Sequence, residues 1–125
     1  MPIAESTDLK ARTKQFALRV MKLVDAIPRT IQGRAIAKQI IRSATSVAAN
    51  YWAACRARSR AEFIAKIGVI EKEADESCFW LELIIDSGLL TEERIRPLLG
   101  EAGELVAIMA ASRKSAIGNR KSAMS

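Results

Sequence analysis

Residues 42–68 read RSATSVAANYWAACRARSRAEFIAKIG, and this stretch decides the fold because it holds the end of one helix and the start of the next. Within it, Ser59-Arg60-Ala61-Glu62 has the form of a capping box. In such a box the serine hydroxyl accepts from the glutamate amide, and the glutamate side chain accepts from the serine amide. The sequence therefore predicts a helix that begins at Ser59 and follows a helix that ends near residue 57.

Apolar residues recur at helical spacing on both sides of this junction. Upstream, a helix over about residues 31–57 has an inner seam in steps of three and four, formed by Ile36 or Ala37, Ile40, Ala44, Val47, Tyr51 and Ala54. Downstream, the stripe consists of Phe63, Ile67, Ile70, Ala74, Cys78, Leu81 and Ile85. Gly88 is the expected stop of this helix.

Two further helices are predicted at the ends of the chain. Residues 7–27 form one, which Pro28 ends. The other begins near Thr91, and Pro97 predicts a kink or a restart within it. No segment alternates with period two. The sequence thus predicts an all-α, antiparallel up-down-up-down four-helix bundle over residues 1–117, with a flexible polar tail at 118–125.

The residue inventory excludes most catalytic chemistry. The chain has 125 residues and no histidine, so Ser46 and Cys55 lack a base that could activate them. Acidic residues concentrate on one helix, whereas carboxylate metal centres in bundles draw ligands from all four. We therefore expect no enzyme activity, no cofactor and no metal. The N-terminal residues lack a secretory core and no apolar run could span a membrane, so a cytoplasmic protein is expected.

The two cysteines are expected to remain reduced. In an antiparallel hairpin Cys55 lies opposite residue 62 and Cys78 opposite residue 39, which separates them by about 24 Å of helix. A disulfide requires Cα atoms within about 7 Å. Both are predicted to be small core residues.

Charge is distributed unevenly along the chain, whose net charge is +6. Residues 1–60 carry 12 basic and 3 acidic side chains, and residues 61–112 carry 4 basic and 11 acidic ones. Three interpretations remain open. The oppositely charged halves attract each other within one bundle; they dock between copies in a ring; or cations bind phosphates, with Arg34, Lys38 and Arg42 joined by Arg56, Arg58 and Arg60.

Apolar residues outside the seams favour assembly. A second row on the helix over 31–57 contains Ile41, Ala48 and Cys55. The next helix adds Val69, Phe79, Trp80 and Leu83. Helices that are apolar on two sides indicate burial in an oligomer, and the alternative is a wide core stripe.

The hairpin resembles the four-helix bundle family named after the protein encoded in intervening sequences of bacterial 23S ribosomal RNA genes. The positions that carry the resemblance are Arg42, Ser46, Asn50, Arg58, Ser59, Glu62, Phe63 and Glu76. This chain departs from the family pattern at Trp52-Ala53-Ala54, where Ala-Glu-Gly is usual, and at Glu73, where serine is common.

The resemblance implies a homopentameric ring and an association with ribosomal RNA genes. A related bundle, the accessory variability protein of diversity-generating retroelements, binds its reverse transcriptase and nucleic acid. We therefore expect a non-enzymatic homo-oligomer whose basic surface associates with structured RNA or DNA, with a reverse transcriptase as a further candidate partner. The alternative is a protein-interaction scaffold or accessory subunit that binds no nucleic acid itself.

Asn50 lies in the middle of a helix among apolar neighbours, so its amide needs a hydrogen-bond partner if it is buried. It is either a packing and register device or a functional polar contact. Glu76 is a candidate acceptor, but the antiparallel register places Asn50 nearer residue 67, so that contact would need a neighbouring subunit or intervening side chains.

Overall fold

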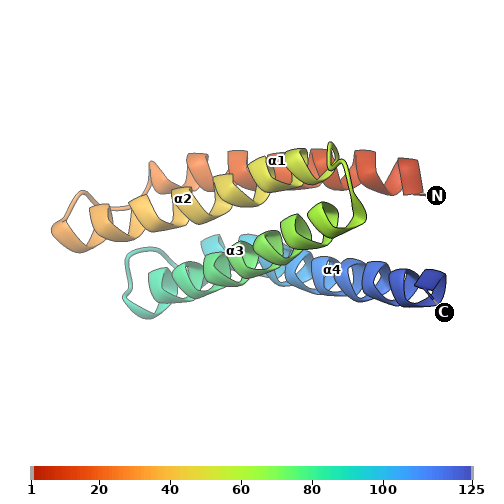
Figure 1. Ribbon diagram of the computed structural model, residues 1–125. Helices are drawn as coiled ribbons and strands as arrows, with labels where there is room; N and C mark the ends of the chain where they lie inside the picture. The colour runs from red at the N-terminus through yellow and green to blue at the C-terminus, as the bar shows by residue number, and fades with distance from the viewer. Residues whose placement is uncertain (1, 125) are drawn as a thin grey trace.

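A computed structural model describes the backbone of residues 2–124 and the side chains of residues 8–118. The described chain consists of four helices without a strand: α1 (Pro2–Val24), α2 (Ile31–Ala54), α3 (Arg60–Asp86) and α4 (Glu92–Met124). The α1–α2 and α3–α4 loops lie at one end, and the α2–α3 loop and both termini lie at the other (Figure 1). Because α4 also contacts α1, the elements close into the predicted up-down-up-down bundle.

The tail predicted over residues 118–125 falls almost entirely outside the described side chains, which end at Gly118. Within the described chain, no helix combines the length and the apolar character needed to cross a membrane.

The start and the stop predicted for α3 are both observed. The Ser59 hydroxyl accepts from the Glu62 amide at 3.1 Å, whereas the Glu62 carboxylate accepts from the amide of Arg58, at 3.0 Å, instead of that of Ser59. Gly88 has a φ of 75° and donates to the Ile85 carbonyl. This left-handed glycine ends α3 as predicted, because a side chain would strain that conformation.

A kink or a restart is predicted at Pro97, and the restart is wrong, because α4 runs through this residue without interruption. Proline lacks the amide that would bind the carbonyl of Glu93. Both Glu93 and Pro97 are exposed, so water can hydrate that carbonyl at little cost.

A short loop joins α1 to α2 and brings two backbone segments very close together. Thr30 caps α2, and its hydroxyl accepts from the Gly33 amide at 3.0 Å. Gly33 is buried, and a Cβ atom built on it would lie 1.9 Å from the Pro28 carbonyl oxygen. The loop therefore has this conformation only with glycine at residue 33.

The core follows the predicted seams, with one shift on α3. The seam of α2 is confirmed, with Ile36 rather than Ala37 fully inside. On α3, Ser77 and Ile84 are fully buried, whereas the predicted Phe63, Cys78 and Ile85 are only partly buried. The buried apolar core of α3 and α4 comprises Ile67, Ile70, Ala74, Leu81, Ile84, Ile95, Leu98, Ala102, Leu105 and Met109. With Ser77 included, the α3 seam advances strictly by three and four, which is the spacing of left-handed helix packing.

Both cysteines are free, as predicted, but the expectation that both are core residues is wrong for Cys55. Cys55 is the C-cap of α2, keeps helical dihedral angles, and is exposed. Cys78 is partly buried.

Candidate functional site

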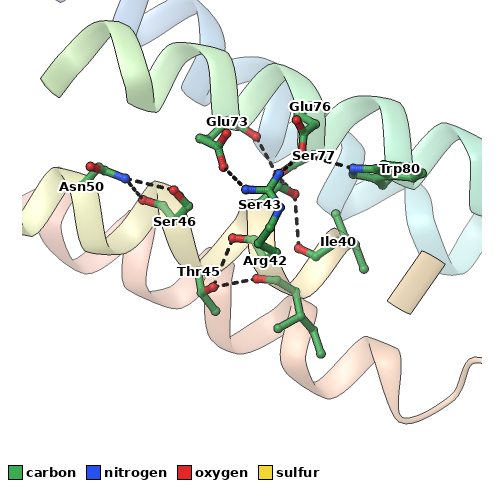
Figure 2. Close-up of polar contacts among 11 residues, drawn as sticks. Ile40, Arg42, Ser43, Thr45, Ser46, Asn50, Glu73, Glu76, Ser77 and Trp80 are labelled. Atoms are coloured by element: carbon green, nitrogen blue, oxygen red, sulfur yellow. Dashed lines mark hydrogen bonds and ion pairs between the residues drawn. The ribbon is translucent and has the colours of Figure 1, made fainter. Parts of the chain in front are cut away.

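A polar network joins α2 to α3 at the centre of the bundle, and Figure 2 shows its side chains converging between the two helices. Arg42 donates hydrogen bonds from its two terminal guanidinium nitrogens: Nη1 to the Glu73 carboxylate at 2.8 Å, and Nη2 to the Glu76 carboxylate. The Glu73 side chain is only 11% exposed, so its carboxylate depends on Arg42 for neutralisation. Glu76 also accepts from the Trp80 indole at 3.4 Å.

A pair of buried serines lies beside these charges. The Ser77 hydroxyl donates to the Ser43 hydroxyl at 2.9 Å, and both residues are fully buried. Each hydroxyl also contacts a carbonyl of its own helix, that of Glu73 or Ile40. The pair satisfies two polar groups inside the seam and sets the register of α2 on α3.

Ion pairs join the basic first half of the chain to the acidic second half within one bundle, in agreement with the interpretation that the two halves attract each other. Besides Arg42, Arg12 on α1 binds Glu101 on α4 at 2.6 Å and lies 3.6 Å from Glu104. The hydrogen bond to Glu101 raises the pKa of Arg12 above its ordinary value, although partial burial opposes this. The opposite charges of the two halves therefore contribute to holding one bundle together.

A further ion pair joins α3 to α4. Arg113 binds Glu71 at 2.8 Å and lowers the pKa of that carboxyl, chiefly through their hydrogen bond. The carboxylate therefore stays ionised at neutral pH and loses this interaction as the pH falls through its lowered pKa.

One group of cations lies at the end of the bundle that carries the α1–α2 loop. Arg34 and Lys38 are exposed on α2, one turn apart. With Arg29 from the loop they line an open groove that has Ile27 and Ala37 among its apolar residues. None of these three cations has an ion-pair partner among the described residues. The lining of the groove combines these three cations with the acidic Asp25 and with apolar side chains.

A second group of cations lies at the opposite end, around the α2–α3 loop. Arg56, Arg58 and Arg60 are all exposed. Arg56 contacts the ring of Trp52, with its guanidinium carbon 5.2 Å from the ring centroid. Lys10 on α1 lies over the same ring, with its ammonium 4.1 Å from the centroid.

The structure separates the six cations that the sequence grouped as one phosphate-binding set. Arg34 lies in the first turn of α2 and Arg56 just after its last residue, about 33 Å further along at 1.5 Å per residue. Between them, the two terminal guanidinium nitrogens of Arg42, Nη1 and Nη2, bind carboxylates of α3. Arg34 and Lys38 therefore form one cationic end, and Arg56, Arg58 and Arg60 form another. Sequence reasoning missed Arg29, Lys10 and Trp52, although the second Trp of a chain with few aromatic residues was a usable signal.

The remaining motif residues have structural contacts. The Asn50 amide donates to the carbonyl and to the hydroxyl of Ser46, both at 2.9 Å, so its partner lies one turn earlier on α2. Phe63 is partly buried and packs against the core. Glu76 belongs to the central network. Among residues 8–118, no group of three or more Cys, Asp or Glu side chains is arranged to hold a metal ion.

The two thiols are expected to differ in reactivity. Burial raises the pKa of Cys78, and the neighbouring Asp75 and Glu82 raise it further, whereas Cys55 is exposed. Because the thiolate is the reactive form, a disulfide reagent added to the native protein at pH 7 should titrate one thiol per chain rapidly and the second only slowly or after unfolding. Cys55→Ser should remove the rapid phase. Loss of the slow phase instead would contradict the assignment.

Comparison with known proteins agrees with this geometry. A family model described as 23S rRNA-intervening sequence protein matches residues 5–111. A protein of unknown function from the S23 ribosomal protein family of Bacteroides thetaiotaomicron, with a crystal structure at 1.70 Å resolution, is 33% identical. Its TM-score is 0.79, and the match covers 85% of this chain and 98% of that one. No curated protein matches the chain. The resemblance noted in the sequence is confirmed: the chain belongs to the family of 23S rRNA-intervening sequence proteins.

Proposed function

We propose that this protein is a non-enzymatic homo-oligomer that binds nucleic acid through the two cationic ends of α2. The observation that carries the proposal is the contrast between cations that are paired and cations that are free of carboxylates. Arg12, Arg42 and Arg113 bind carboxylates of neighbouring helices, whereas Arg34, Lys38, Arg56, Arg58 and Arg60 are exposed without an ion-pair partner among the described residues.

Unpaired surface cations at and beside helix ends suit the phosphate backbone of a nucleic acid. Each phosphate contact releases a condensed counterion, so binding weakens steeply as salt increases and depends little on base sequence. The family description, which refers to sequences within 23S rRNA, is consistent with RNA as the ligand. Ribosomal RNA or retroelement RNA and DNA are the ligands we propose to test.

The oligomer we propose is a pentameric ring. Large apolar side chains outside the core support assembly, since Leu18, Met21, Val69 and Phe79 are each between 42% and 54% exposed. A ring would also repeat the cationic ends and so raise the affinity for a long polyanion. Light scattering coupled to gel filtration tests the assembly. A particle of 13.7 kDa would contradict any oligomer, and a dimer would contradict the ring.

Removing the cationic end at the α2–α3 loop is expected to weaken nucleic-acid binding. The affinity decreases with salt, so the plot of log affinity against log salt concentration has a negative slope. In the variant Arg56→Ala/Arg58→Ala/Arg60→Ala this slope should become less steep by about 3, because each lost phosphate contact removes about 0.9. Fluorescence anisotropy with a labelled structured RNA and a labelled DNA duplex, over a range of salt concentrations, measures this slope.

A matched variant removes the same charge from the other half of the bundle. Lys72→Ala/Arg94→Ala/Arg96→Ala replaces three exposed cations of α3 and α4 and should leave the slope close to that of the parent protein. Equal losses in both variants would mean that net charge, rather than the ends of α2, determines binding. Absence of binding to both ligands at low salt would refute the proposal.

A second candidate function is an accessory subunit or scaffold for a protein partner, such as a reverse transcriptase. The exposed side chains of Val69 and Phe79 on α3 favour it, because an apolar surface suits a protein partner. The absorbance of a salt-washed preparation distinguishes the two candidates. Retained nucleic acid argues against a scaffold that binds protein alone.

A further inference from the structure

Trp52 occupies an unusual position for a large aromatic residue. It lies near the C-terminal end of α2 and is 44% exposed, whereas its neighbour Tyr51 is 4% exposed and fills the core. In the same turn of α2, Ala54 is also buried, at 2% exposure. The indole of Trp52 is therefore outside the apolar core and does not fill it.

Two cations from different segments contact the ring of Trp52. Lys10 comes from α1 and Arg56 from the residues that follow α2, at 4.1 Å and 5.2 Å from the ring centroid. Exposed cation–π contacts of this kind contribute little to folding stability. Neither cation has a carboxylate partner among the described residues, so both can contact a phosphate.

An exposed aromatic face flanked by cations has the composition of a single-strand binding site. Bases stack on aromatic side chains, and nearby cations follow the sugar-phosphate backbone. Bases inside a duplex are already stacked on each other, so only an unpaired base can use such a ring. The cluster also adjoins the exposed Arg58 and Arg60, which continue the positive surface along the loop.

We infer that Trp52 is a stacking platform for an unpaired base of single-stranded RNA or DNA, with Lys10 and Arg56 binding the adjacent phosphates. The inference rests on the proposed function and adds the class of ligand that one cationic end takes. On binding, the flexible Lys10 side chain moves from the ring to a phosphate, and the base takes its place on the indole. The opposite end, with Arg34 and Lys38, has no aromatic residue in its groove.

The test compares three ligands by fluorescence anisotropy: a single-stranded oligouridylate of about 12 nucleotides, an abasic strand of the same length, and a duplex. Trp52→Ala should weaken binding of the oligouridylate roughly tenfold and leave the abasic strand and the duplex unchanged. Trp52→Phe should retain most of the affinity because it keeps an aromatic face. Phe79→Ala removes another exposed aromatic residue, on α3, and should change none of the three affinities.

A spectroscopic measurement reports the stacking itself. The chain has two tryptophans, so Trp80→Phe leaves Trp52 as the only indole. The oligouridylate should quench its fluorescence, whereas the abasic strand and the duplex should not. Circular dichroism of Trp52→Ala should match the parent protein, which shows that a loss of binding is not a loss of fold.

The outcomes separate this inference from the proposed function. If the oligouridylate and the abasic strand bind equally and Trp52→Ala changes neither, stacking is refuted while phosphate binding stands. If Trp52→Ala weakens binding of all three ligands equally, Trp52 positions the neighbouring cations and does not stack on a base, and the inference is again refuted. If no ligand binds, both the inference and the proposed function are refuted.

Discussion

Gly33→Ala is expected to destabilise the protein by about 3 kcal/mol, the upper end of the usual range of about 1–3 kcal/mol for adding a carbon where there is no room. The added Cβ would lie 1.9 Å from the Pro28 carbonyl oxygen and 3.1 Å from the Ile27 side chain. The first of these is a backbone atom, so the α1–α2 loop must move as a whole. That movement also disturbs the cap that Thr30 forms on α2. Urea denaturation at a fixed protein concentration measures the loss.

The same substitution elsewhere should have the opposite effect. Nothing lies within 4 Å of the Cβ position of Gly100 or Gly103, and both are exposed residues of α4. Alanine there should stabilise by about 0.5–1 kcal/mol, because glycine loses more conformational freedom in a helix. If Gly33→Ala also stabilised the protein, the close approach to Pro28 would be refuted.

Arg42→Ala is expected to cost about 2 kcal/mol, the range for removing the partner of a charged, largely buried hydrogen-bonding group. It leaves Glu73 buried without its cation and removes the bridge to Glu76. Arg42→Lys should recover only part of the loss, because one ammonium group does not reproduce the planar fork that binds two carboxylates. Thermal and urea denaturation measure both variants.

A double-mutant cycle identifies the cause of the loss. If the unpaired Glu73 causes it, then Arg42→Ala combined with Glu73→Gln should be less destabilising than the sum of the two single changes. The matched control is Arg96→Ala, which breaks an exposed pair with Glu92 within α4 and should cost no more than about 0.5 kcal/mol. An Arg42→Ala effect as small as this would show that the central network does not stabilise the bundle.

The central network also bears on the two cationic ends. Because Arg42 is bound to carboxylates, the middle of α2 contributes little free positive charge. The Arg42→Ala variant should therefore change nucleic-acid affinity less than removal of Arg56, Arg58 and Arg60.

The sequence by itself determined the elements of this fold and most of its core. Helical periodicity predicted four helices, and the capping box at Ser59 and the glycine at residue 88 predicted both ends of α3. These features depend on residues within about one helical turn of each other, so the sequence of one helix predicts them without knowledge of the helix that packs against it. Even so, Pro97 did not interrupt α4 and Cys55 was not buried, and local periodicity indicates neither outcome.

Only the tertiary structure decided which polar and charged groups meet. Serine at residue 77 looks unsuited to a core seam until Ser43 on α2 is placed opposite it. Arg42 and Arg34 look alike as cations of one stripe, but only Arg42 has carboxylates of α3 within reach. Lys10 and Trp52 lie far apart in sequence and meet on the surface. Such pairings join residues 31 to 42 positions apart and depend on the register of the helices that carry them. Local periodicity predicts which face of a helix is buried but not which residues of another helix pack against it.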